Sequence, residues 1–142
     1  MGLAVIDASV AVKWFLEEAD TDAALNLQSD FLEGHLTLRV PSVFPYEVLN
    51  ALAFSRRFRD REMIEAARTL DRTDLVTVPL LGEYSEQTVV RSVRDRITIY
   101  DASYLSLAAT LRCPLFTADG ELVEFDRPDA RVVHIREYER TD

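Results

Sequence analysis

The sequence lacks several features that define whole classes of protein. It contains a single cysteine, Cys113, so no disulfide can form within the chain, which suits a reducing compartment. No apolar run approaches the roughly 20 residues that a membrane-spanning helix needs. The apolar start, MGLAVIDAS, has none of the basic residues that open a secretory signal peptide. We therefore expect a cytoplasmic protein without membrane association, and its 142 residues (1–142) are of the length of a single domain.

Motifs for nucleotide binding and phosphotransfer are also missing. The four glycines form neither G-x-x-x-x-G-K-[ST] nor G-x-G-x-x-G. A phosphoacceptor receiver domain would need paired acids after the first strand and a lysine late in the chain, whereas Asp7 stands alone and the only lysine is Lys13. A haloacid-type phosphatase would need a second Asp where this chain has Ser9. These classes are therefore excluded at the level of motifs.

Charge of one sign dominates. There are 25 acidic residues against 16 basic ones, and a net charge of -9 should repel a polyanion and argues against a non-specific nucleic-acid binder. Four arginines nevertheless gather in the segment SRRFRDR: Arg56, Arg57, Arg59 and Arg61. This segment is either a solvated helix end or a local patch that contacts RNA or a protein partner.

Apolar runs and helical patterns alternate along the chain. The segments LAVID, LTLRV, LVTVPL, CPLFTAD and RVVHI are typical of short buried strands, and the stretches between them have helical spacing. Such alternation predicts an α/β fold with a parallel sheet and helices on both faces.

Four acids occupy equivalent places in this pattern. Asp7 ends the first strand and opens a helix, Glu47 lies in the first turn after LTLRV, Asp101 opens the helix after ITIY, and Asp119 follows PLFT. Ligands of open α/β sheets collect at the carboxyl ends of the strands, so we expect all four acids on that edge. The alternative for each acid is simple capping of a helix N-terminus, although Glu is a poor capping residue.

Clustered carboxylates call for a counter-charge. Two of them ~5 Å apart repel by roughly 3 kcal/mol at an effective dielectric constant near 20, which favours protonation or a bound cation. Ligands that are all oxygens fit Mg²⁺ or Mn²⁺, and such an ion can support hydrolysis of a phosphodiester. Ser9 and Thr117 could orient water or a carboxylate, or bond the local backbone. Asn50 lies one turn after Glu47 on the same helix face and could bind substrate or support the fold.

The segments around these acids resemble a known family. VIDASVAVKWF, PSVFPYEVLNAL, IYDASYLSLA and LFTADGEL are similar, in the same order, to the four acidic motifs of PIN-domain ribonucleases, and the DASV…KW opening is most similar to VapC-type toxins. The resemblance runs from Leu3 to about Ile135. It implies a PIN-like α/β/α fold and a Mg²⁺- or Mn²⁺-dependent endoribonuclease of a type II (VapBC) toxin–antitoxin pair. The three acids that the family shares most widely would be matched by Asp7, Glu47 and Asp101. The fourth acid, which varies more, would be matched by Asp119.

The resemblance also implies supporting residues and partners. Ser9 and Thr117 match hydroxyl positions that accompany the first and fourth acids, Asn50 matches an Asn beyond the Glu, and Glu121 leaves open which acid completes the metal shell. The implied partners are an RNA substrate, a second copy in a homodimer and a small VapB-type antitoxin that blocks the acidic site. The alternative function is a non-catalytic interaction module whose acidic pocket only docks a partner's arginine. Metal-dependent RNA cleavage separates the two.

Overall fold

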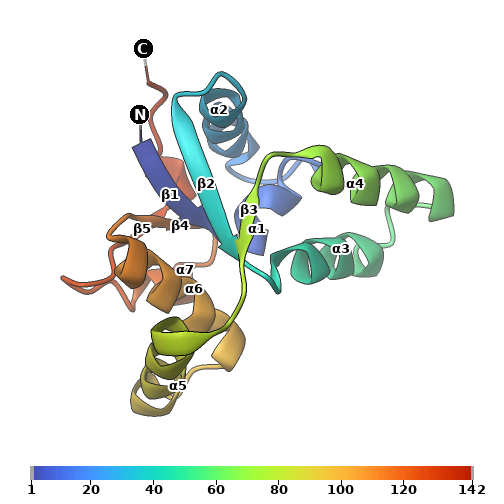
Figure 1. Cartoon of the computed structure of the whole chain (residues 1–142). Helices are drawn as coiled ribbons and strands as arrows, with labels where there is room; N and C mark the ends of the chain where they lie inside the picture. Colours follow the sequence, from blue (N-terminus) through green and yellow to red (C-terminus); the bar gives the residue numbers. More distant parts are fainter. Residues whose placement is uncertain (1, 142) are drawn as a thin grey trace.

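A five-stranded parallel sheet forms the centre of the computed structural model, which describes residues 2–141 (Figure 1). The strands are β1 (Gly2–Ile6), β2 (Leu36–Pro41), β3 (Val76–Val78), β4 (Leu115–Thr117) and β5 (Val132–His134). Their order across the sheet is β3-β2-β1-β4-β5, and every neighbouring pair is parallel. The predicted parallel α/β sheet is therefore confirmed, with the first strand of the chain at its centre.

Helices cover both faces of the sheet. They are α1 (Ala8–Val12), α2 (Thr21–Leu32), α3 (Phe44–Phe54), α4 (Asp60–Arg72), α5 (Gly82–Asp95), α6 (Ile99–Leu111) and α7 (Gly120–Val123), followed by a 3₁₀ turn, η1 (Ile135–Glu137). In Figure 1, α5 and α6 lie on one side of the sheet, and α2, α3 and α4 lie on the other. None of the helices within residues 2–141 is both long and apolar enough to cross a membrane.

The most deeply buried elements are β1 and α6. Ala4, Val5 and Ile6 have no exposed surface, because the central strand of a sheet covered on both faces meets apolar side chains on each side. Every residue of α6 from 102 to 108 is buried, since this helix packs on β1, β2 and β4 while α5 covers it from outside. Its Ala102 and Ala108 are small enough for such close packing. The acid of α6, Asp101, is thereby attached to one of the most deeply buried elements.

The start of α6 differs from the expectation that Asp101 opens the helix directly after an apolar run at a strand end. The helix begins two residues earlier, at Ile99, and within residues 2–141 it is preceded by α5 rather than by a strand. Thr98 is the N-cap: its hydroxyl oxygen accepts the backbone N–H of Asp101 at 3.0 Å. A threonine oxygen satisfies an N–H group that would otherwise lack a partner at a helix start, which is why the helix begins here.

Candidate active site

Asp7 is the most constrained of the four acids. It lies where β1 ends and α1 begins, and its side chain is 7% exposed. Ser9 Oγ donates to its Oδ1 at 2.5 Å, and Thr117 Oγ1, from the end of the neighbouring strand β4, donates to its Oδ2 at 2.5 Å. The backbone N–H of Ala118 in turn donates to Ser9 Oγ at 2.9 Å. Two hydroxyls from separate elements therefore hold the carboxylate in one orientation. Orienting a carboxylate is one of the roles that the sequence analysis left open for Ser9 and Thr117.

Burial makes the charge of Asp7 costly. It raises the pKa of Asp7 from 3.8 to about 6, and the negative charge of Asp119 adds to this rise. The hydrogen bonds from Ser9 and Thr117 favour the charged form and keep the pKa from rising further. At neutral pH the carboxylate is ionised but electrostatically unfavourable, so a positive charge beside it would be stabilising.

Glu47 is held by a residue that the sequence analysis missed. The hydroxyl of Tyr104 on α6, a side chain only 2% exposed, donates to Glu47 Oε1 at 2.6 Å and so connects α6 to α3. Burial raises the pKa of Glu47, the charge of Asp101 adds to the rise, and the bond from Tyr104 opposes it. The available signal was spacing, since Tyr104 follows Asp101 by three residues on one helix face.

Asp101 and Asp119 complete the group. Burial raises the pKa of Asp101, and the charges of Asp119 and Glu121 raise it further. Asp119 caps α7 by accepting the N–H of Glu121 at 2.9 Å, and its own N–H donates to Thr117 Oγ1 at 3.0 Å. Thr117 thus positions the first acid through its hydroxyl hydrogen and the fourth through its oxygen.

The alternative of simple helix capping holds for two acids only. Asp7 and Asp119 are N-caps of α1 and α7, each accepting a backbone N–H with its side chain. Thr98 is the N-cap of α6 in place of Asp101, and the N-cap of α3 is Val43, with no side-chain capping bond. Capping therefore does not account for Asp101 and Glu47, which are half-buried acids at the same edge.

Repulsion links all four acids and bears on whether they fit a metal ion. The charge of Asp119 acts on both Asp7 and Asp101, and the charge of Asp101 acts on Glu47. Within residues 2–141, no three acidic, histidine or cysteine side chains stand close enough to make a ready-formed ion site. Asp7 and Glu47 are instead turned toward hydroxyl donors. An all-oxygen, mutually repelling set fits a hard divalent cation by its chemistry.

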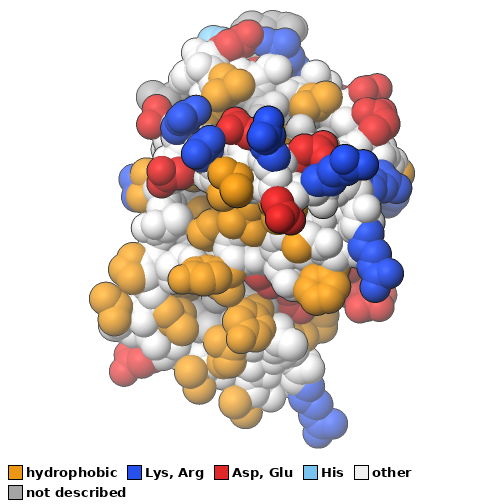
Figure 2. Space-filling view, turned by 90° about the vertical axis from the view of Figure 1, so that its right-hand side faces the viewer, with side chains coloured by type: hydrophobic (Ala, Val, Ile, Leu, Met, Phe, Trp, Pro, Cys, Tyr) orange, Lys and Arg blue, Asp and Glu red, His pale blue; other side chains and the backbone are white. Residues whose placement is uncertain are grey.

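The remaining candidate residues are Asn50, one helical turn after Glu47 on α3, and the arginines of SRRFRDR. Asn50 is exposed and makes no side-chain hydrogen bond in the part of the chain that the structure describes. The exposed arginines of SRRFRDR lie at the far end of α3 and the start of α4, and Arg56 is nine residues beyond Glu47, about 13 Å along a helix. At the height of α4, Figure 2 shows basic side chains interspersed with acidic ones. These arginines are free for contact but do not converge with the acids.

Replacing Tyr104 by Phe should destabilise the protein by about 1–2 kcal/mol, because a hydrogen bond to a charged group is lost from a buried position. Urea unfolding monitored by circular dichroism measures this. The matched control is Tyr46→Phe, since Tyr46 adjoins Glu47 in sequence but is 77% exposed, and its stability should not change. Equal stability of the two variants would contradict a role for the Tyr104 hydroxyl.

Comparison with known proteins finds relatives that match most of the chain. The family model described as "PIN domain" matches residues 4–128. Ribonuclease VapC9 of Mycobacterium tuberculosis is 30% identical over 124 residues, covering 83% of this chain and 87% of the relative.

Solved structures share the fold. The crystal structure of Mycobacterium tuberculosis VapC20, described as a sarcin-ricin loop cleaving toxin, aligns with a TM-score of 0.68 at 17% identity over 90% of this chain and 98% of that one. A toxin–antitoxin complex from Klebsiella pneumoniae aligns with a TM-score of 0.65 at 16% identity over 93% of this chain and 97% of that chain. The α/β/α arrangement expected from the sequence is thus confirmed by similarity to these structures.

Proposed function

Because this chain belongs to the PIN domain family, we propose that it is a Mg²⁺- or Mn²⁺-dependent endoribonuclease, the toxin of a VapBC-type toxin–antitoxin pair. The observation that carries the proposal is the buried carboxylate of Asp7, held by two hydroxyls and repelled by a neighbouring acid. Beyond its capping of α1, the charge of this buried carboxylate is costly to the fold, and a bound cation would offset that cost. The relatives named as VapC ribonucleases support RNA as the substrate.

Each acid has a defined task in this proposal. Asp7, Glu47, Asp101 and Asp119 would hold the ion, which when bound would supply a more acidic water and neutralise charge on the phosphoryl oxygens. Ser9 and Thr117 orient Asp7, and Tyr104 orients Glu47.

Proton transfer falls to Asp101. Its carboxylate is half-buried with a raised pKa and lies among like charges, so one of its oxygens is suited to accept the proton of the attacking water.

The decisive experiment incubates purified, antitoxin-free protein with total cellular RNA in Mg²⁺, in Mn²⁺ and in chelator. Discrete cleavage products that require metal are the expected result. If folded protein leaves the RNA intact under all three conditions, the non-catalytic docking module becomes the better description. If cleavage products do form, mapping their ends would identify the RNA that the toxin prefers.

A VapB-type antitoxin is the protein partner we propose. The acidic edge would accept a basic side chain of the antitoxin as readily as a metal ion, so the bound antitoxin should block cleavage. The Klebsiella pneumoniae structure that shares this fold is itself a toxin–antitoxin complex. The arginines of SRRFRDR remain open to contact with either RNA or antitoxin.

We also propose a homodimer that forms through the outer face of α5. This helix buries Tyr84, Thr88 and Arg91 on one side, yet its opposite side carries Val89, Val90 and Val93, all exposed. At 100° per residue, the three valines centre almost opposite the buried residues. Apart from Glu86, which lies on the same side of the helix, this face offers exposed apolar side chains that a second copy of the chain could bury.

Val93→Glu should therefore shift the protein from dimer to monomer, since it places a charge on a side chain that is 74% exposed at the centre of this face. Size-exclusion chromatography with light scattering gives the mass. Leu32→Glu is the matched control, because Leu32 on α2 is 69% exposed elsewhere on the molecule and should leave the dimer intact. A monomeric wild type would refute the dimer outright.

A further inference from the structure

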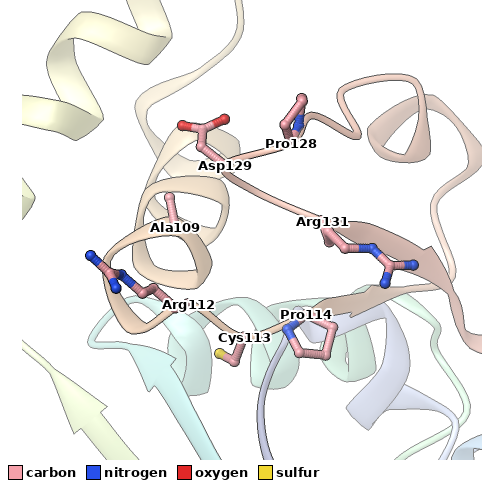
Figure 3. A pocket seen from close by; sticks show the side chains of 7 residues that line it. All are labelled: Ala109, Arg112, Cys113, Pro114, Pro128, Asp129 and Arg131. Carbon is pink, nitrogen blue, oxygen red and sulfur yellow. The ribbon is translucent and has the colours of Figure 1, made fainter.

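One hollow of the molecule lies away from the acids and has no side chains that converge on a common point. It has a volume of about 580 Å³ and lies at the amino end of β4, whereas the acids lie at the carboxyl edge of the sheet (Figure 3). Arg112 and Arg131 line it, but their side chains point away from each other, and its acid, Asp129, is paired with Arg91. The side chains that do gather near the acids are aromatic.

The exposed aromatic side chains lie around the acidic edge. Tyr46, Phe54 and Tyr100 are 77%, 75% and 57% exposed, whereas every other Phe, Tyr and Trp of residues 2–141 is at least partly buried. Tyr46 directly precedes Glu47, and Tyr100 directly precedes Asp101. Exposed rings that flank a site add little to the core, and they are suited to contact with a ligand.

Phe54 lies on the same side of α3 as Glu47. Glu47, Asn50 and Phe54 follow one another at intervals of three and four residues, and the first and last are within about 20° of each other around the helix. Tyr46 is four residues before Asn50 and shares this side, whereas the residues that α3 buries lie opposite. This exposed side of α3 therefore begins beside an acid and carries an aromatic ring near each end.

Positive charge follows the exposed side of α3. Arg56 and Arg57 come within three residues of Phe54, and both are exposed. Neither side chain forms a salt bridge or a hydrogen bond within residues 2–141. Guanidinium groups remain charged at any physiological pH and offer paired N–H donors to phosphate. Free guanidiniums next to an exposed ring are therefore a local exception on a chain whose net charge is -9.

We propose that a single strand of RNA lies along the exposed side of α3, with bases stacked on the three exposed rings and phosphates at the arginines that follow. Every base presents a π-face to a ring, and proteins bind single strands by combining such rings with basic groups. Tyr46 and Phe54 are about 12 Å apart along the helix, the length of about four nucleotides stacked at about 3.4 Å each. The inference rests on the proposed nuclease function, because this path brings a phosphodiester to Glu47 and Asp101.

A strand with unpaired bases fits this surface better than a duplex or a protein. In a duplex the bases stack on one another and are not available to the rings. A protein interface buries a continuous apolar patch at its centre, whereas Asn50 separates the rings of Tyr46 and Phe54. The exposed valines proposed for the dimer lie on α5, on the other side of the sheet (Figure 1).

Fluorescence anisotropy of a labelled single-stranded oligouridine measures the binding. The titration is run in chelator at constant ionic strength, so that RNA is not cleaved and screening is equal throughout. An unlabelled RNA duplex of the same length should compete more weakly than the unlabelled single strand. Tyr46→Ala, Phe54→Ala and Tyr100→Ala should each weaken binding about 5- to 150-fold, which is the range for the loss of one stacked base.

Matched variants separate stacking from other effects of the substitutions. Tyr46→Phe and Phe54→Tyr keep an aromatic ring and should bind as the wild type does. Leu32→Ala removes an exposed apolar side chain from α2 and should also leave the affinity unchanged. Arg57→Gln should reduce the slope of log affinity against log salt by roughly 0.7, the value for one phosphate of a single strand, whereas Arg112→Gln should leave the slope unchanged.

Photocrosslinking identifies the rings that contact bases. An oligouridine that carries one 5-iodouridine is irradiated in the complex, and mass spectrometry of the digested protein locates the crosslinked residue. Crosslinks should lie at Tyr46, Phe54 or Tyr100. This readout reports contact directly, so it does not depend on whether an alanine variant folds.

The proposal is overturned if the wild type does not bind the single strand, if the three alanine variants bind as tightly as the wild type, or if crosslinks lie only elsewhere. It is also overturned if Tyr46→Ala or Phe54→Ala lowers the mass in light scattering, or the affinity for an antitoxin, while RNA binding is unchanged, since a protein then occupies this surface.

Binding in chelator is independent of cleavage, so the two proposals fail separately. A protein that cleaves RNA in metal but whose affinity does not depend on the rings refutes the stacking surface alone. A protein that binds RNA through the rings but cleaves none in Mg²⁺ or Mn²⁺ refutes the nuclease alone.

Discussion

Asp101→Asn is expected to reduce metal-dependent RNA cleavage by about 100-fold or more while leaving the fold intact. The substitution is nearly isosteric and removes one negative charge from the acidic edge. Since Thr98 rather than Asp101 caps α6, the helix start loses nothing. The pKa of Asp101 is raised by burial and by Asp119 and Glu121, so the charge is unfavourable in the absence of metal. Thermal stability without metal should therefore be unchanged or slightly higher.

Cleavage of a fluorescent oligoribonucleotide and the melting temperature in chelator are the two readouts. Asp71→Asn is the control, because it is the same substitution at an exposed position on α4. It should leave both readouts at the wild-type level. An Asp101→Asn variant that cleaves at the wild-type rate would remove Asp101 from the catalytic group, and one that melts much earlier would reveal a structural role instead.

Asp7→Asn is expected to stabilise the metal-free protein at pH 7 by about 1–3 kcal/mol. In the folded state burial raises the pKa of Asp7 from its ordinary value of 3.8 to about 6. Below about pH 4, Asp7 is protonated in both states and contributes no difference. Between about pH 4 and pH 6 it ionises first in the unfolded chain, so the folded wild type loses stability as the pH rises. Above pH 6 the loss is complete, and two pKa units correspond to about 3 kcal/mol.

Urea unfolding in chelator, repeated from pH 4 to pH 7.5, tests this expectation. The wild type should lose stability relative to Asp7→Asn across that interval. Added Mg²⁺ should then raise the stability of the wild type more than that of the variant. Thr117→Val is a second test. The Thr117 hydroxyl lowers the pKa of Asp7, so its removal should move the pH-dependent loss of stability to higher pH. Parallel stability curves for wild type and Asp7→Asn would contradict a costly charge at this position.

The sequence by itself determined the arrangement of secondary structure and the acids. Continuous apolar runs such as LAVID can be read as buried strands because a central parallel strand is covered on both faces. The helical spacing of the stretches between them is equally local. Together these patterns predicted the parallel sheet. The position of Asp7 at the end of the first strand predicted that the acids lie at the carboxyl edge of that sheet. The start of α6 was missed because ITIY is apolar, although Thr98 within it was the capping residue.

Only the tertiary structure decided which side chains meet. Thr117 lies 110 residues from Asp7, yet their side chains are hydrogen-bonded because β4 pairs with β1. Tyr104 and Glu47 are 57 residues apart and meet where α6 approaches α3. Arg112 and Arg131 line one hollow because β5 returns beside β4. Periodicity records which face of an element is apolar, but it carries no information on the order of strands across the sheet. That order is set by the packing of the whole chain, and it determines the partners of each acid.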